Sequence, residues 1–371
     1  MHMSELTSAQ LQAMEHITRY ARTRQKEAKR VIDDILQMSN ISRETYEEAV
    51  AKLKSRARIA LHFHPDRPAP HHRSVAEALL EQGHYRSQFE TGISSGSVSA
   101  YPGGARDVWE ARMFGGAYQA EGVSNGQRPK YGALALWPHP DGPAPRFGSC
   151  YFLLSPKTAA RSTYTYLDSH QDPKEKGTYA EFDDITAALL KDAFFEERAI
   201  GEKNTSPRKL IDQLLNGLEQ PFQAAAAMKP SRNLNHYIEA QVHGTIDLQT
   251  DVDMLVADPS FKTAPTGRIL EQLCFKYGIT LYWHRGFAIR AEDVPADFRG
   301  PSMPSLARRI AVNGRVDASA IGAAALDLKS RPEAWLDRGC YEDAVQELKY
   351  MWHILVRYGD AAGRIGDQGS S

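Results

Sequence analysis

The chain has few of the features that mark several common protein classes. Its three cysteines, Cys150, Cys274 and Cys340, are odd in number and far apart, so they form neither a disulfide framework nor a CxxC metal site. No apolar run is long enough to cross a membrane, and the N-terminus lacks the apolar core of a signal peptide. These absences predict a protein of a reducing cytoplasm with no membrane partner.

The charge balance and the lack of glycine-rich loop motifs argue against a nucleic-acid-binding protein and against the standard nucleotide-binding folds. The 45 basic residues are matched by 46 acidic ones, so a nucleic-acid partner has no electrostatic support. Neither a GxGxxG motif nor a P-loop is present, so the standard sites for dinucleotides and triphosphates are missing.

The pattern of apolar residues divides the 371 residues into three regions. A helical region is expected at 1–60, a mixed region at 61–300, and a helical region with a frayed tail from Gly359 at 301–371. Within the first region, Ser42 is expected to cap a second helix. In the mixed region we expect strands at 131–137, 150–154, 163–167, 237–244 and 279–283, and helices at 75–83, 185–197, 207–218 and 268–277. Because the strands do not alternate strictly with helices, the sequence predicts an α+β fold with a mainly antiparallel sheet.

The expected strand at 237–244 carries the densest cluster of chemical side chains. Glu239, Gln241 and His243 share one face, as alternation in a half-buried strand requires. A carboxylate beside an amide can bind sugar hydroxyls and stabilise positive charge, although an ordinary exposed strand face fits the same pattern. Thr163 and Thr165 share a face of another expected strand, where their hydroxyls can brace a carboxylate or bind a ribose.

Two other segments suit a nucleotide-like ligand. Arg86 precedes a Ser- and Gly-rich stretch at 94–97, a place from which a guanidinium can bind a phosphate or diphosphate. Phe114 and Tyr118 flank a tight glycine turn and can either stack on a flat heterocycle or pack in the core.

A metal site is the main competing interpretation. His62 and His64 lie on one face of an extended segment, at a spacing known for metal ligands. With Asp168 or His243 they would form a hydrolase site that activates water. The two histidines can equally serve only the fold, and a non-enzymatic module that binds a partner through its helical arms also stays open.

In chain order, the segment of Arg86 is followed by RPKYGAL from Arg128, RSTYTYLDS from Arg161 and YIEAQVHG from Tyr237. In this order the chain resembles the ADP-ribosyltransferase toxin superfamily, in its bacterial branch with R–S/T–E motifs, over roughly residues 61–287. It also resembles a bacterial effector family of unknown function related to the threonine-specific ubiquitin ADP-ribosyltransferases.

The resemblance implies a split, mainly antiparallel sheet and NAD as the substrate that donates ADP-ribose to a protein, with a threonine of host ubiquitin as candidate acceptor. It implies no metal, no nucleic acid and no membrane partner, and delivery from the bacterial cytoplasm into a host cell by a secretion system. The residues it implies for NAD binding are Arg86, Phe114, Tyr118, Ser162, Thr163 and Thr165, and those for catalysis are Glu239 and Gln241.

One position departs from the superfamily. Its last motif is E/Q-x-E with the catalytic glutamate second, whereas this chain has Glu239 first and Gln241 second. Either the acid has moved along the strand, or Gln241 fills the usual position and Glu239 has another task.

Overall fold

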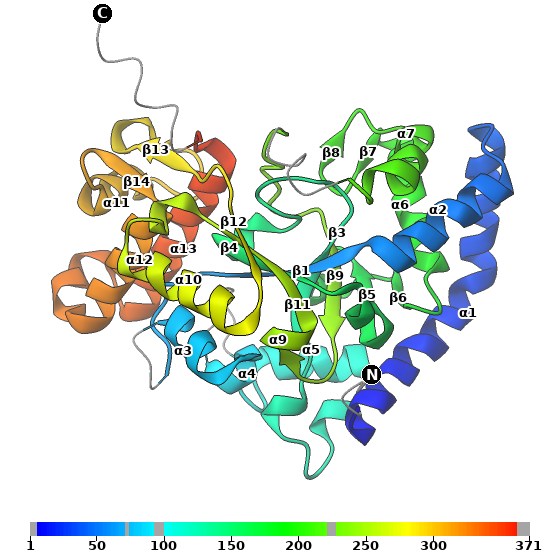
Figure 1. Ribbon diagram of the computed structural model, residues 1–371, viewed down its shortest axis with the longest axis horizontal. Helices are drawn as coiled ribbons and strands as arrows, with labels where there is room; N and C mark the ends of the chain where they lie inside the picture. The colour runs from blue at the N-terminus through cyan, green and yellow to red at the C-terminus, as the bar shows by residue number, and fades with distance from the viewer. Residues whose placement is uncertain (1–5, 71–73, 93–99, 221–227, 362–371) are drawn as a thin grey trace, which may run out of the picture.

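The described residues of the computed structural model, 6–70, 74–92, 100–220 and 228–361, form a central eight-stranded sheet (Figure 1). The strand order is β12-β11-β4-β1-β3-β9-β5-β6, and every neighbouring pair is antiparallel except β11 with β12. The strands of this sheet are β1 Arg58–Phe63, β3 Lys130–Ala135, β4 Cys150–Leu154, β5 Ser162–Tyr166, β6 Lys176–Thr178, β9 Ile238–Val242, β11 Val252–Ala257 and β12 Thr280–Trp283. The prediction of an α+β fold with a mainly antiparallel sheet is confirmed.

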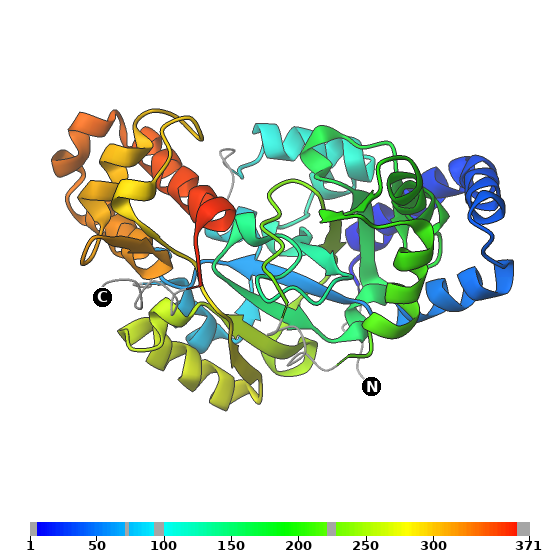
Figure 2. The same ribbon diagram turned by 90° about the horizontal axis from the view of Figure 1, so that it is seen from above.

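Helices flank the sheet, with α1 and α2 at one end of the molecule and α11 to α13 at the other (Figures 1 and 2). The α-helices are α1 Ser8–Met38, α2 Arg43–Arg56, α3 Val75–Gln82, α4 Gln88–Thr91, α5 Ala105–Phe114, α6 Asp183–Phe195, α7 Pro207–Asp212, α9 Leu248–Asp251, α10 Pro265–Tyr277, α11 Met303–Ile310, α12 Ala318–Ser330 and α13 Tyr341–Tyr358. Of the single turns, three matter for the site: η3 Pro145–Phe147, η4 Pro156–Arg161 and η5 Ser169–Gln171.

Small two-stranded sheets complete the described fold. They pair β2 with β10, β7 with β8, and β13 with β14. Their strands are β2 His84–Tyr85, β7 Arg198–Ala199, β8 Glu202–Lys203, β10 Ile246–Asp247, β13 Ala288–Arg290 and β14 Arg315–Asp317.

The boundary between the first helical region and the sheet differs from the prediction. As expected, Ser42 caps α2, because its side chain accepts a hydrogen bond from the Thr45 backbone N–H. The helix was expected to continue to about residue 60, but it ends at Arg56 and β1 begins at Arg58. Five of the six residues of β1 are buried, so the strand lacks the alternation by which a strand is told from a buried helix.

The expected frayed tail does not begin at Gly359. Asp360 exchanges two backbone hydrogen bonds of 2.9 Å with Ala288, which ties the end of α13 to β13. The rest of the expected tail, 362–371, lies outside the described residues.

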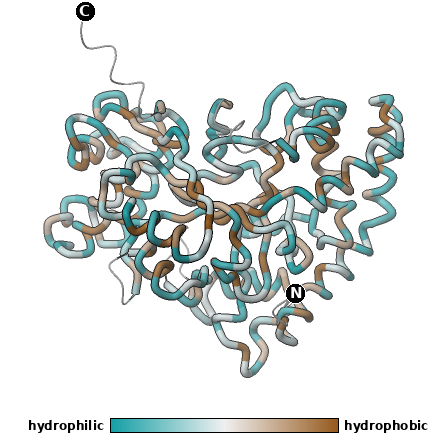
Figure 3. The backbone as a smooth tube through the Cα atoms, in the orientation of Figure 1, coloured by the Kyte–Doolittle hydropathy of each residue, from teal (hydrophilic) through white to brown (hydrophobic). Residues whose placement is uncertain are grey.

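The largest cluster of buried apolar residues contains side chains from all three predicted regions, including Ile32 of α1, Phe152 of β4 and Leu348 of α13. Figure 3 shows the same arrangement, with hydrophobic colours along the central strands and hydrophilic colours on the outer helices. The C-terminal helix is fixed against the centre, since the Trp352 indole donates a 2.8 Å hydrogen bond to the Pro145 carbonyl. α13 is therefore placed where it can contribute to a site on the sheet, and the domain boundaries at 60 and 300 stay a prediction.

Candidate functional site

Two adjacent cavities, of about 480 and about 160 Å³, lie beside β1, β3 and β9. We call the pair the sheet cleft. The wall that both cavities share is formed by His62, Tyr85, Arg86, Gln88, Arg146, Phe147 and Lys349. The smaller cavity also contains the carboxylates of Asp168 and Glu239. Cations on a shared wall next to two carboxylates give the cleft a polarity that a plain apolar pocket lacks.

Glu239 projects from β9, the strand between β3 and β5. It is 6% exposed, and both of its carboxylate oxygens are held. The Gln241 side-chain amide donates to Oε1 at 2.9 Å, and the Ser169 backbone N–H donates to Oε2 at 3.4 Å. The carboxyl group is therefore fixed in one orientation at the cavity.

The protonation of Glu239 is shifted towards neutrality. Burial and then the nearby charge of Asp168 raise the pKa of Glu239 to about 7. Asp168 is itself held in place, by the Tyr237 hydroxyl at 2.9 Å and the His170 backbone N–H at 2.9 Å. A carboxyl group with a pKa near 7 can both accept and donate a proton at physiological pH, which is what acid–base catalysis needs.

A chain of hydrogen bonds sets the direction of the Gln241 amide. Burial lowers the pKa of His243 to about 3, so its imidazole is neutral and has one donor and one acceptor nitrogen. Because the single hydroxyl proton of Thr163 is donated to Gln241, the Thr163 oxygen accepts from His243 Nε2 at 3.1 Å, and Nδ1 accepts from the Tyr118 hydroxyl. Thr163 then donates to Gln241 Oε1 at 2.9 Å, which leaves the amide nitrogen directed at Glu239.

Of the two residues predicted for catalysis, Glu239 lines the small cavity, whereas Gln241 is fully buried behind it. Ser162, Thr163 and Thr165, which were predicted to bind NAD, do not lie at the cleft. All three are fully buried in β5, one strand further from the cleft, and none lines either cavity. Their hydroxyls bond within the protein, and Thr163 acts on Glu239 only through Gln241.

The prediction that Phe114 and Tyr118 stack on a ligand is also not met. Each is 1% exposed, and their rings meet edge to face at 5.4 Å in a cluster with Ala13 and Ile17 of α1. The turn between them was correctly read as a place where two aromatics meet, but α1 covers it and makes it core.

The aromatic rings at the small cavity come from residues that the sequence analysis missed. Trp109 of α5, Tyr131 of β3 and Tyr237 line it. The Arg106 guanidinium lies 4.4 Å from the Trp109 ring centre and 5.4 Å from that of Tyr131. Arg106 and Trp109 are three residues apart on one face of a helix, a spacing that would have indicated a joint surface.

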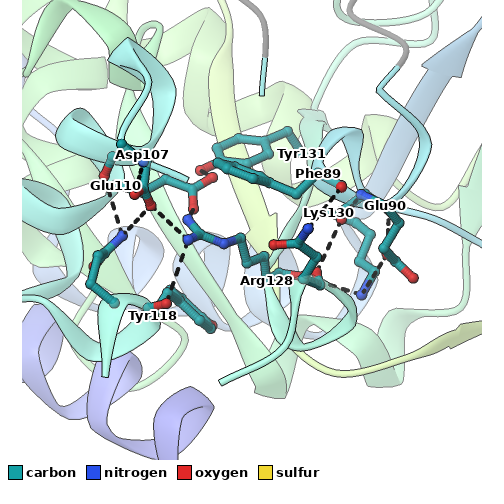
Figure 4. Close-up of polar contacts among 12 residues, drawn as sticks. Phe89, Glu90, Asp107, Glu110, Tyr118, Arg128, Lys130 and Tyr131 are labelled. Carbon is teal, nitrogen blue, oxygen red and sulfur yellow. Dashed lines mark hydrogen bonds and ion pairs between the residues drawn. The ribbon is translucent and has the colours of Figure 1, made fainter. Parts of the chain in front are cut away.

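A buried ion-pair network holds α5 in this position (Figure 4). Arg128 pairs with Asp107 at 2.6 Å and with Glu110 at 2.8 Å, and its guanidinium lies 3.9 Å from the Phe89 ring centre. The Tyr131 hydroxyl donates to the other oxygen of Glu110 at 2.7 Å. Because every charged group here has a partner, this network is a structural support for the aromatic wall.

Arg86 reaches the cleft from an unexpected element. It directly follows the two-residue β2, which pairs with β10 and not with the central sheet. Its exposed side chain lines both cavities, so the structure does bring it together with Glu239. The segment 94–97 lies outside the described residues.

His62 and His64 are used by the fold. His62 Nδ1 donates to the Gly148 carbonyl at 3.3 Å and Nε2 accepts from the Ala144 backbone N–H at 3.3 Å, so neither nitrogen is free for a metal. Burial lowers the pKa of His62 to about 3, and the His64 ring packs edge to face on Trp352. No group of three or more metal-ligating side chains occurs within the described ranges.

The comparison with protein families identifies the family of the chain and the residues that match it, but it names no activity. Residues 58–358 match the family described as "Protein of unknown function (DUF3626)", and the chain therefore belongs to this family. The matched range begins at the start of β1 and ends at the last residue of α13, so it spans the whole cleft. No curated protein matches the chain. Among the described helices none is long and apolar enough to span a bilayer.

Proposed function

We propose that this DUF3626 family member is an NAD-dependent mono-ADP-ribosyltransferase with the split antiparallel sheet of that superfamily. The supporting observation is the buried, oriented carboxyl of Glu239 in a small aromatic-walled cavity, beside a wall that carries Arg86, Arg146 and Lys349. Such a site suits a substrate with a flat cationic ring, a ribose and a diphosphate in a row.

In this proposal the nicotinamide ring packs against Trp109 and Tyr131, and its ribose lies at Glu239. When the C–N bond breaks, its electron pair leaves with neutral nicotinamide and positive charge develops on the ribose. Ionised Glu239 stabilises that charge, and the effect is large in a cavity that excludes water. An acceptor hydroxyl then attacks the ribose carbon and transfers its proton to the Glu239–Asp168 pair.

In the same proposal, the remaining parts of NAD occupy the rest of the cleft. The fork of Arg86 on the shared wall is suited to the diphosphate. The adenosine half would extend into the large cavity, where Val75, Ala78 and Leu79 offer apolar surface. A threonine of host ubiquitin is the candidate acceptor, and delivery into a host cell belongs to the same proposal. A metal-dependent hydrolase has less support because both ring nitrogens of His62 are engaged.

The test is release of nicotinamide from NAD by the purified full chain, with mass spectrometry of ubiquitin in the same reaction. Glu239→Ala should slow release about a hundredfold, as expected for loss of electrostatic stabilisation. Glu121→Ala, at an exposed position away from the cleft, is the matched control and should keep the wild-type rate. A Glu239→Ala protein that releases nicotinamide at the wild-type rate would refute the assignment.

A further inference from the structure

Three cations from three separate segments converge at the side of the cleft formed by α13. They are Arg146 of η3, Arg299 in the loop before α11, and Lys349 of α13, and we call them the α13 cation cluster. Arg146 and Lys349 line both cavities. The Arg299 guanidinium lies 5.5 Å from the ring centre of Tyr350, the neighbour of Lys349. Burial, and then the charges of Arg146 and Arg299, lower the pKa of Lys349 to about 8, consistent with their closeness.

The cluster has hydrogen-bond donors without partners. Nε of Arg146 and Nε of Arg299 are buried, and neither has an acceptor among the described residues. One turn after Lys349, His353 is 2% exposed, and both of its ring nitrogens are likewise without a partner in the described part of the chain. Buried polar groups in native proteins are nearly always paired, so several orphans in one place indicate a missing partner.

The missing partner carries negative charge. Two of the three buried arginines among the described residues pair with carboxylates: Arg128 with Asp107 and Glu110 (Figure 4), and Arg161 with Asp251 at 3.0 Å. Within the described residues no carboxylate forms an ion pair with any member of the α13 cation cluster. Like charges held together without a counterion oppose folding, whereas the same charges facing a cavity are suited to an anionic ligand.

We propose that the α13 cation cluster is a binding site for a phosphoryl group, with Arg146 and Lys349 contacting it from the cavity wall and Arg299 adding charge behind them. A phosphoryl group suits the site better than a carboxylate, because it offers more negative charge and more acceptor oxygens to converging donors. The ligand is either the diphosphate of a dinucleotide or a phosphate on another molecule. The inference does not require transferase activity.

The test is calorimetric titration of the full chain with inorganic pyrophosphate, inorganic phosphate and NAD. Lys349→Gln and Arg299→Gln should each weaken pyrophosphate binding roughly tenfold or more, the effect of losing a charge-assisted hydrogen bond or a close charge. Lys329→Gln, an exposed lysine on α12, removes the same charge elsewhere and should leave the affinity unchanged. Unchanged pyrophosphate affinity in both cluster variants, or no binding of pyrophosphate to the wild type, would overturn the proposal.

The titration with NAD distinguishes the two possible sources of the phosphoryl group. If the cluster variants weaken NAD and pyrophosphate alike, the ligand is the diphosphate of the dinucleotide. If they weaken pyrophosphate and phosphate but not NAD, the site takes a second, phosphate-bearing ligand. If the protein binds pyrophosphate but does not release nicotinamide from NAD, the phosphoryl site is supported and the proposed transferase activity is refuted.

Thermal unfolding without anions supplies a second readout. A purely structural cation should stabilise the fold, so its loss would lower the melting temperature. If instead the cation serves to bind a ligand and is repelled by its neighbours, replacing it should give a variant at least as stable as the wild type. Marked destabilisation of both variants without anions would count against the proposal.

Discussion

Replacing Glu239 by Gln should change how the stability of the protein depends on pH. The wild-type carboxyl has its pKa raised from 4.5 to about 7, by burial and then by Asp168. A group whose pKa is higher in the folded than in the unfolded state binds its proton more tightly when folded. Its contribution to stability is therefore complete below pH 4.5, falls as the pH rises towards 7, and stays low above that.

The size of the effect follows from the shift. The linkage relation gives a loss of about 3 kcal/mol over the whole interval, and about 2 to 3 kcal/mol between pH 5 and pH 8. A glutamine at this position stays neutral, so that loss disappears. The amide also replaces the oxygen that accepts from the Ser169 N–H, which costs about 1 kcal/mol at every pH. Only the difference between the two pH values therefore reports the carboxyl.

Urea unfolding at pH 5 and pH 8 measures this difference. The unfolding free energy of Glu239→Gln minus that of the wild type should be about 2 to 3 kcal/mol higher at pH 8 than at pH 5, so the variant gains relative stability as the pH rises. Glu121→Gln, an exposed position, is the matched control and should show no such change. If the relative stability of Glu239→Gln is the same at both pH values, the carboxyl is not destabilised by burial and Asp168, and the acid–base role loses its basis.

Two further variants test the supports of the site. Gln241→Ala should lower the unfolding free energy by about 2 to 3 kcal/mol, because the buried Thr163 hydroxyl and Glu239 Oε1 both lose a partner, and should reduce kcat for nicotinamide release more than it changes KM. Unchanged urea midpoint and kcat would contradict the hydrogen-bond chain. Arg128→Ala should cost about 3 to 5 kcal/mol by leaving Asp107 and Glu110 buried without their cation, and should speed hydrogen exchange in α5. Arg112→Ala on the same helix should cost less than about 0.5 kcal/mol, and equal losses in the two arginine variants would refute the special role of Arg128.

Local patterns predicted five of the eight strands of the central sheet, and missed β1, β6 and β11. The range 150–154 is identical to β4, and the alternation at 237–244 contains β9, because side chains on a strand must alternate between its faces. The start of α2 could also be predicted from local sequence, because Ser42 stands directly before an amphipathic run. The end of α2 was missed because β1, which is buried on both faces, shows no alternation of buried and exposed residues.

Site residues could be predicted only where their role is local. Glu239 was predicted from the polar face of its own strand and from the order of the motifs, both of which can be read along the chain. Lys349 could not be found, since only the docking of α13 onto η3 brings it to the shared wall. Phe114 and Tyr118 fit a ligand pocket and a core equally well, and the choice was made by α1, about a hundred residues earlier in the chain.

The order of Glu239 and Gln241 also has its explanation in tertiary contacts. Both side chains leave the same face of β9, as does His243, yet that face is not uniform along the strand. At its far end Phe114 and Tyr118 pack around His243 and bury it completely, whereas at its near end Glu239 meets the cavity. A carboxylate at position 241 would face the Thr163 hydroxyl, which itself bonds to the buried imidazole, and would lie away from any ligand in the cleft. In this chain the position that faces the cleft is therefore the first of the two, and the second is suited to an amide, which can accept from one neighbour and donate to the next.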